Sequence, residues 1–320
     1  MLTHVSRRAL AGASVAVGAA LLTACSGAEA GTGDGTETAT VVVSANNGEV
    51  EVPAEPLRVA VLDNTAFETV KAFGITPVAV PKPLLPGTGF EDWEADESIA
   101  DAGSHREPVL EAVSEAEPDL ILGGYRFEDH TEQLSRIAPV LDLAPSEDHE
   151  GGYVESLKRQ TETLGEVLGH PEEAAALIAD LEDSVAAAAA ATGGESVFLA
   201  VASGGRIDNG ASRLGRILEP LDLVNVLADE GDAVHSDSGL APETIAQLNP
   251  DWMVVLDRDA AVEEGATSPA RQLVSEQEAW AGTTFTTQDQ VVYLPPTFYV
   301  TEGVQAYTAV FDQITDAFTA

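Results

Sequence analysis

A sixteen-residue pattern occurs twice in this 320-residue chain, with an offset of 132 positions. The first copy, from Glu111 to Arg126, reads EAVSEAEPDLILGGYR, and the second, from Glu243 to Arg258, reads ETIAQLNPDWMVVLDR. Both begin with glutamate, carry Pro-Asp at the eighth and ninth positions, continue with an apolar run and end with arginine. This order predicts a short amphipathic helix, a turn and a buried strand in each copy. We therefore expect two α/β halves that are built alike.

The rest of the chain fits this expectation. The stretches RVAVLD, TAFETVKAFG and TPVAV alternate between strand and helix patterns, and ESVFLAVAS restarts the alternation after Gly194. Between them, residues 153–192 are helical apart from a break at Gly169-His170-Pro171, and TVVVSANNGEVEVP predicts a hairpin. The predicted fold is two Rossmann-like α/β lobes, residues 41–165 and 193–320, joined by a long helix at 166–192, with a ligand cleft between the lobes.

Both copies of the pattern place an arginine just beyond the carboxyl end of a strand, where open α/β sheets bind ligands. We therefore expect Arg126 and Arg258 to face the cleft from opposite lobes. Each arginine could instead pair with a nearby acid, such as Asp129 or Asp257. The matching positions in the two halves favour the cleft.

The N-terminus has the features of a secretory signal. Two arginines precede an apolar run, residues 9–22, that is shorter than the ~20 residues needed to span a bilayer. The run ends in LTAC, which matches a bacterial lipobox and predicts a signal peptide at 1–24, lipidation of Cys25 and a flexible tether at 25–40. Cys25 is the only cysteine, so a disulfide within the chain is excluded. The adjacent arginines fit either Sec or twin-arginine export.

The charge balance restricts the partners. The chain has 54 acidic and 15 basic residues, a formal charge of −39, and loss of the two leader arginines would make it −41. Nucleic acid and anionic lipid headgroups are therefore poor partners, and we expect membrane contact through the lipid alone. An acidic surface suits a saline or alkaline exterior, or serves solubility only.

The chain resembles the periplasmic-binding-protein family that serves iron-siderophore ABC importers, and within it the catecholate receptors. The resemblance runs through VEVPAEPLRVAVLDNTAFETVKAFGI, REPVLEAVSEAEPDLILGGYR, GASRLGRILEPLDL, LAPETIAQLNPDWMVVLDRDAA and VVYLPPTFYVTEG. It implies a non-enzymatic, monomeric, lipid-anchored extracytoplasmic receptor with a helical linker. Its ligand would be an iron(III)-siderophore complex delivered to permease subunits, with no covalent cofactor besides the lipid.

The resemblance also implies a binding site with three arginines, Arg126, Arg213 and Arg258, with Arg206 as the alternative to Arg213. A ferric tris-catecholate is a trianion, so guanidinium groups would offset its charge and donate hydrogen bonds to its oxygens.

Further site residues follow from the same resemblance. Tyr299 would line the cleft and can ligate iron directly, as can His235, while Tyr125 also lines the cleft. Tyr299 could instead be a core aromatic and His235 an exposed loop residue, whose spacing to Glu243 is about one residue longer than the family pattern. Glu111 and Glu243 would dock onto the permease, or stabilise the starts of their helices.

Other functions stay open at this point. A hydroxamate siderophore is the nearest competing ligand, followed by haem and cobalamin, which share the architecture. A bare metal ion needs several converging ligands, whereas the histidines of the mature chain are scattered. A lipid-anchored hydrolase is a further alternative: the chain contains no HExxH and no GxSxG, but a catalytic triad assembles in space and leaves no fixed spacing.

Overall fold

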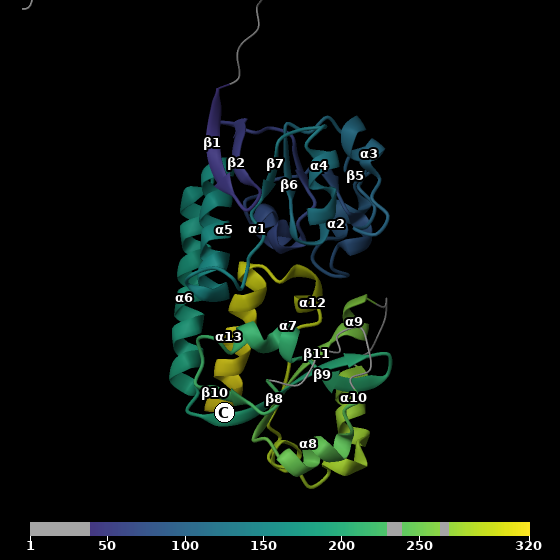
Figure 1. The fold of residues 1–320 in the computed structure, drawn as a ribbon, viewed down its shortest axis with the longest axis vertical. Coiled ribbons are helices and arrows are strands. Elements are labelled where there is room, and N and C mark those ends of the chain that lie inside the picture. The colour runs from purple at the N-terminus through teal and green to yellow at the C-terminus, as the bar shows by residue number, and fades with distance from the viewer. Residues whose placement is uncertain (1–38, 229–238, 263–268) are drawn as a thin grey trace, which may run out of the picture. The chain divides into compact units, whose positions relative to one another are not determined.

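A computed structural model describes residues 39–228, 239–262 and 269–320. It contains two five-stranded sheets with helices packed around them (Figure 1). The first sheet has the order β5-β4-β3-β6-β7 and is parallel throughout. Its strands are β3 (Val59–Val61), β4 (Ala79–Val80), β5 (Ala100–Asp101), β6 (Leu120–Gly123) and β7 (Val140–Asp142).

The second sheet has the order β10-β8-β11-β12, also parallel, with β9 antiparallel beside β8. Its strands are β8 (Glu195–Ser203), β9 (Arg206–Asn209), β10 (Leu223–Asn225), β11 (Trp252–Asp257) and β12 (Val291–Tyr293). Each sheet carries an apolar core on both faces, as parallel strands require. The expected architecture of two α/β lobes is confirmed.

Short helices connect the strands of each lobe. In the N-terminal lobe they are η1 (Asn64–Ala66), α1 (Phe67–Ala72), η2 (Lys82–Leu84), α2 (Glu91–Ala95), α3 (Leu110–Glu115), η3 (Tyr125–His130) and α4 (Thr131–Leu134). In the C-terminal lobe they are α7 (Ala211–Leu214), η4 (Gly215–Ile217), α8 (Pro242–Leu248), α9 (Arg258–Val262), α10 (Pro269–Glu276), η5 (Glu278–Trp280) and α11 (Thr284–Thr287). After β12 the chain ends with the short α12 (Phe298–Thr301) and the 16-residue α13 (Val304–Thr319).

The two copies of the sequence pattern fold alike. In each copy a short helix, α3 or α8, is followed by a residue in the left-handed conformation, Glu117 (φ 45°) or Asn249 (φ 46°). The aspartate of each Pro-Asp then accepts a hydrogen bond from a backbone N–H at the start of another strand of its sheet. Asp119 accepts from Arg58, directly before β3, and Asp251 from Ser196, the second residue of β8. Strands β6 and β11 follow, each in the interior of its sheet.

Two long helices pack against both lobes. These are α5 (Gly152–Leu168) and α6 (Pro171–Ala191). On α5, Leu157 belongs to the core of the C-terminal lobe and Leu164 to that of the N-terminal lobe. On α6 the order is reversed, since Ala174 packs with the N-terminal lobe and Leu181 with the C-terminal lobe. The pair therefore runs antiparallel along both cores.

A hairpin covers the edge of the first sheet. Its strands, β1 (Thr40–Ala45) and β2 (Gly48–Pro53), are antiparallel, as the sequence predicts. At the turn, Asn46 donates its backbone N–H to the carbonyl of Asp142, and the Asn47 side chain donates to the carbonyl of Val140. The turn is thereby held against β7.

The lobes also contact each other directly, between η1 and α1 on one side and α12 and α13 on the other. Asn64 donates to the carbonyl of Val300, and Thr69 Oγ1 lies 3.1 Å from Gln305 Oε1. A Cβ on Gly303 would come within 2.3 Å of the Thr65 carbonyl oxygen, so this close approach requires glycine.

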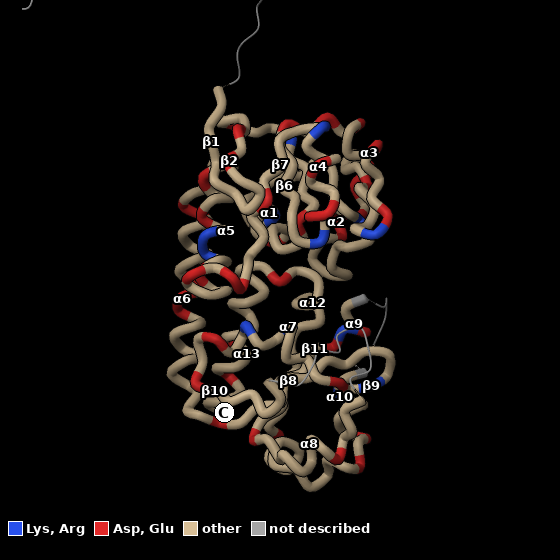
Figure 2. The backbone as a smooth tube through the Cα atoms, viewed as in Figure 1, with Lys and Arg blue, Asp and Glu red and all other residues tan. Residues whose placement is uncertain are grey.

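Acidic positions occur along both lobes, and basic ones are few (Figure 2). Within the described residues no helix has the length and apolarity needed to span a bilayer.

Candidate ligand-binding site

The turn that presents Arg126 has an unusual backbone. It follows β6, with Gly124 at φ 92° and Tyr125 at φ 46°. A Cβ on Gly124 would lie 2.2 Å from the Oδ1 atom of the buried Asp142, so both the φ angle and the close contact select glycine. Arg126 is therefore held at the carboxyl end of the sheet by a turn that few other sequences could form.

Arg258 is the first residue of α9 and directly follows β11. The neighbouring Asp257 is buried and accepts backbone hydrogen bonds from Ala260 and Ala270 over 3.0 and 2.9 Å. Arg258 is instead 3.7 Å from Asp259. The buried carboxylate of Asp257 thus orders the backbone after the strand, while the guanidinium of Arg258 extends to other partners.

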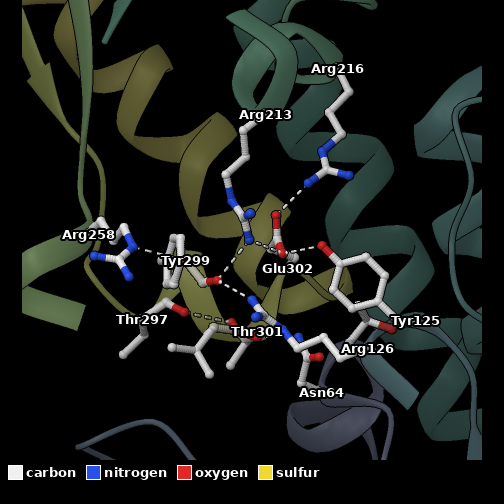
Figure 3. Close-up of polar contacts among 12 residues, drawn as sticks. Asn64, Tyr125, Arg126, Arg213, Arg216, Arg258, Thr297, Tyr299, Thr301 and Glu302 are labelled. Carbon is white, nitrogen blue, oxygen red and sulfur yellow. Dashed lines mark hydrogen bonds and ion pairs between the residues drawn. The ribbon is translucent and has the colours of Figure 1, made fainter. Parts of the chain in front are cut away.

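The guanidinium groups of three arginines converge on Tyr299 (Figure 3). Its backbone carbonyl accepts hydrogen bonds from Arg126 at 3.3 Å and Arg213 at 3.0 Å, and its hydroxyl accepts one from Arg258 Nε at 3.2 Å. The same three guanidinium groups lie 5.6, 4.4 and 5.5 Å from the ring centroid, within the range of cation–π attraction. The structure brings together the three arginines and the tyrosine that the sequence singled out.

A buried carboxylate, Glu302, lies beside this cluster and was not predicted from the sequence. It is fully buried, has φ 49°, and accepts hydrogen bonds from Arg213 at 2.6 Å and from the Tyr125 hydroxyl at 2.7 Å. Arg216, which the sequence places only as a neighbour of Arg213, donates to its other oxygen. The one sequence signal was an acid directly after the apolar run FYVT.

Burial near Glu302 keeps the surrounding phenols neutral. It raises the pKa of Tyr125 to about 12, and the negative charge of Glu302 acts in the same direction. Burial also raises the pKa of Tyr153, whose ring lies 4.4 Å from the Arg216 guanidinium. Tyr125 is therefore a hydrogen-bond donor to Glu302 at physiological pH.

A cavity of about 720 Å³ opens at this site. Tyr125, Arg126 and Arg213 line it, whereas Arg258 and Tyr299 do not, and Tyr299 is only 5% exposed. The remaining polar lining residues include three acids: Asn46, Glu128, Asp142, Ser146 and Asp148. Arg206 lies on β9 and lines a separate cavity of about 410 Å³, so Arg213 and not Arg206 joins the cluster.

The other residues singled out by the sequence lie elsewhere. Glu111 and Glu243 are exposed, and each is the second residue of its helix, α3 or α8. Cys25 and His235 lie outside the described residues.

Among the residues that the structure describes, no group of three or more His, Cys, Asp or Glu side chains is arranged to hold a metal ion. Two histidines do come close, since His130 Nε2 lies 2.9 Å from the backbone carbonyl of His105. That contact places one imidazole against a peptide oxygen and provides no second metal ligand.

Several known proteins are similar to this chain in sequence. The chain is 27% identical to the petrobactin-binding protein YclQ of Bacillus subtilis (strain 168) over 288 residues, 88% of each chain. It is 25% identical to the ferric-anguibactin-binding protein FatB of Vibrio anguillarum over 250 residues, 75% of this chain and 77% of that protein.

The fold agrees with this relationship. The crystal structure of the periplasmic catecholate-siderophore binding protein VctP from Vibrio cholerae superimposes with a TM-score of 0.76 and 25% identity, covering 87% of this chain and 100% of that one. The family model described as periplasmic binding protein matches residues 59–297. With two parallel sheets, matched arginines at the strand ends and this match over most of its length, the chain belongs to the periplasmic binding protein family.

Proposed function

We propose that the mature protein captures a ferric siderophore between its lobes and presents it to an ABC importer. The observation that carries the proposal is the convergence on Tyr299 of Arg126 from the N-terminal lobe with Arg213 and Arg258 from the C-terminal lobe. Cations supplied by both lobes suit an anionic ligand that bridges them. The petrobactin- and anguibactin-binding relatives and the catecholate-siderophore binding neighbour support the same ligand class.

The three clustered arginines favour a catecholate over a hydroxamate. A ferric tris-catecholate is a trianion, and guanidinium groups in a partly dehydrated cleft donate charge-assisted hydrogen bonds to its oxygens. The strongly acidic chain repels anions at long range, but physiological salt screens that field beyond about 8 Å. Local arginines therefore decide whether an anion binds.

We propose that the protein is a lipoprotein with its folded part outside the cytoplasm, held by lipid on Cys25. The lipobox at residues 22–25 and the Gly- and Thr-rich stretch that follows support this arrangement. Glu111 and Glu243 would contact the permease, one from each lobe. Their exposure at equivalent positions of α3 and α8 supports this role.

Tryptophan quenching with a panel of ligands tests the function. Trp93, Trp252 and Trp280 are buried in the two lobes and can transfer energy to a coloured ferric complex. Ferric tris-catecholate and bis-catecholate complexes should quench at submicromolar concentration, whereas a hydroxamate complex should bind more weakly. Saturable binding of haem or cobalamin with none of the ferric siderophores would overturn the proposal. Hydrolysis of chromogenic esters would point to an enzyme.

A further inference from the structure

We infer that Glu302 is a positioning residue that holds the cleft arginines in place before any ligand arrives. The inference rests on the proposed capture of an anionic ferric complex. Glu302 is fully buried, and its two oxygens are shared among three donors: Arg216 at Oε1, and Arg213 and the Tyr125 hydroxyl at Oε2 (Figure 3). Those donors come from both lobes.

A buried anion at this point solves an electrostatic problem. The side chains of Arg213 and Arg216 are only 13% and 9% exposed. Two guanidinium groups with so little access to water would repel each other. Without an anion between them, nothing would compensate for their lost hydration. Glu302 supplies that anion, although it must adopt a left-handed backbone (φ 49°) that is costly for a residue with a side chain.

Arg213 and Arg216 both bind the Glu302 carboxylate, but they differ in their access to the cavity. Arg216 donates to Glu302, lies over the ring of Tyr153 and does not line the 720 Å³ cavity. Arg213 does line the cavity, and it also donates to the Tyr299 carbonyl over 3.0 Å. Glu302 therefore keeps Arg216 as an internal cation and holds Arg213 at the cavity wall.

The hydrogen bond from Tyr125 extends this control to the other lobe. Tyr125 precedes Arg126 in the strained turn after β6, and its hydroxyl reaches Glu302 over 2.7 Å across the lobe boundary. One carboxylate is thus connected to the segments that carry Arg126 and Arg213. A site ordered in advance loses less conformational entropy when the ligand binds.

Neutralising Glu302 separates two possible roles of this residue. If Glu302 only supplies negative charge, anion affinity should rise; if it positions the arginines, anion affinity should fall. Glu302→Gln removes one negative charge from the cluster, so a purely electrostatic effect would strengthen the binding of an anion. Arg216 and Arg213 donate to different oxygens of Glu302, so in a glutamine one of the two arginines would face an NH₂ group, which cannot accept a hydrogen bond. Loss of positioning should therefore weaken ferric tris-catecholate binding by about tenfold or more, in spite of the lost negative charge.

The experiment measures dissociation constants by quenching for wild type, Glu302→Gln, Tyr125→Phe and the exposed, charge-matched control Glu166→Gln on α5. Circular dichroism of the ferric charge-transfer band reports how the cleft orients the complex. Tyr125→Phe leaves both arginine pairs intact, and we expect about threefold weaker binding and an altered band. The control should match wild type in both measurements.

The outcomes separate this inference from the proposed function. If wild type binds no ferric siderophore, the proposed function fails. If wild type binds and Glu302→Gln binds equally or more tightly, the positioning role is wrong. If Glu302→Gln does not fold, Tyr125→Phe decides, and an unchanged affinity with an unchanged band would overturn the inference.

Discussion

Arg258 Nε donates a hydrogen bond to the hydroxyl of Tyr299, 3.2 Å away, and its guanidinium lies 5.5 Å from the centre of the same ring. Tyr299 lies 41 residues further along the chain. The arginine that ends the second sequence repeat is therefore anchored on the residue that the other cleft arginines also contact.

Replacing this arginine should weaken ligand binding more than folding. The Arg258 side chain is 29% exposed and its nearest carboxylate, Asp259, is 3.7 Å away, so Arg258→Ala should change the free energy of unfolding less than it changes the affinity. Loss of a charge-assisted contact to the ferric complex should cost more than ~1.5 kcal/mol of binding free energy, about tenfold in affinity. Quenching titrations and urea unfolding measure the two effects. Arg136→Ala, at an exposed position on the protein surface, is the matched control. Unchanged affinity with lowered stability would assign Arg258 a structural role.

Removal of the Tyr299 hydroxyl should show whether Tyr299 only supports the three arginines or also ligates iron. Tyr299→Phe keeps the ring beneath the three guanidinium groups and removes the acceptor of Arg258. A hexadentate tris-catecholate fills the coordination sphere, so its affinity should fall by no more than about tenfold, the effect of one hydrogen bond. A tetradentate bis-catecholate leaves iron sites free, and the wild type should then show a tyrosinate charge-transfer band that the variant lacks. Identical visible spectra would rule out direct ligation by Tyr299.

Asp63 should make stability depend on pH. Burial raises its pKa from 3.8 to about 7, and the nearby Asp142 adds to this, although hydrogen bonds from Thr65 and the charge of Arg126 oppose it. The folded protein thus keeps a proton that the unfolded chain releases near pH 4. The contribution is full below that pH, and the free energy of unfolding falls as pH rises toward 7.

Asp63→Asn mimics the protonated side chain and should flatten this decline. Urea unfolding between about pH 4.5 and 7.5 measures it, with the exposed Asp180→Asn on α6 as the control. A slope equal to that of wild type would mean that Asp63 is not the group responsible.

Charge reversal at the two exposed glutamates should separate capture from delivery. Glu111→Arg and Glu243→Arg lie on α3 and α8, away from the cavity, so affinity for the ferric complex should be unchanged. Uptake of radioactive iron by cells that carry the cognate permease should fall sharply for either variant, and further for the pair. Glu166→Arg controls for the change in charge. Normal uptake by the double variant would remove these residues from the docking surface.

Much of the architecture could be predicted from the sequence because its signals are local. The Pro-Asp turn, the apolar run and the final arginine lie within sixteen residues, and their recurrence indicates two sheets of the same kind. The carboxyl end of a parallel strand is a fixed place in such a sheet, so Arg126 and Arg258 could be assigned to the cleft from position alone. Arg213 and Tyr299 needed the family resemblance, since no repeat marks them.

Glu302 could not be found in this way. Its partners Tyr125 and Arg213 lie 177 and 89 residues away, and nothing in a sequence records which distant cations will surround a carboxylate. Local pattern follows from backbone geometry and the burial of apolar side chains, so the sequence alone determines the lobes and the strand ends. The pairing of buried charges depends on how both lobes pack and exclude water, and that arrangement exists only in the folded chain.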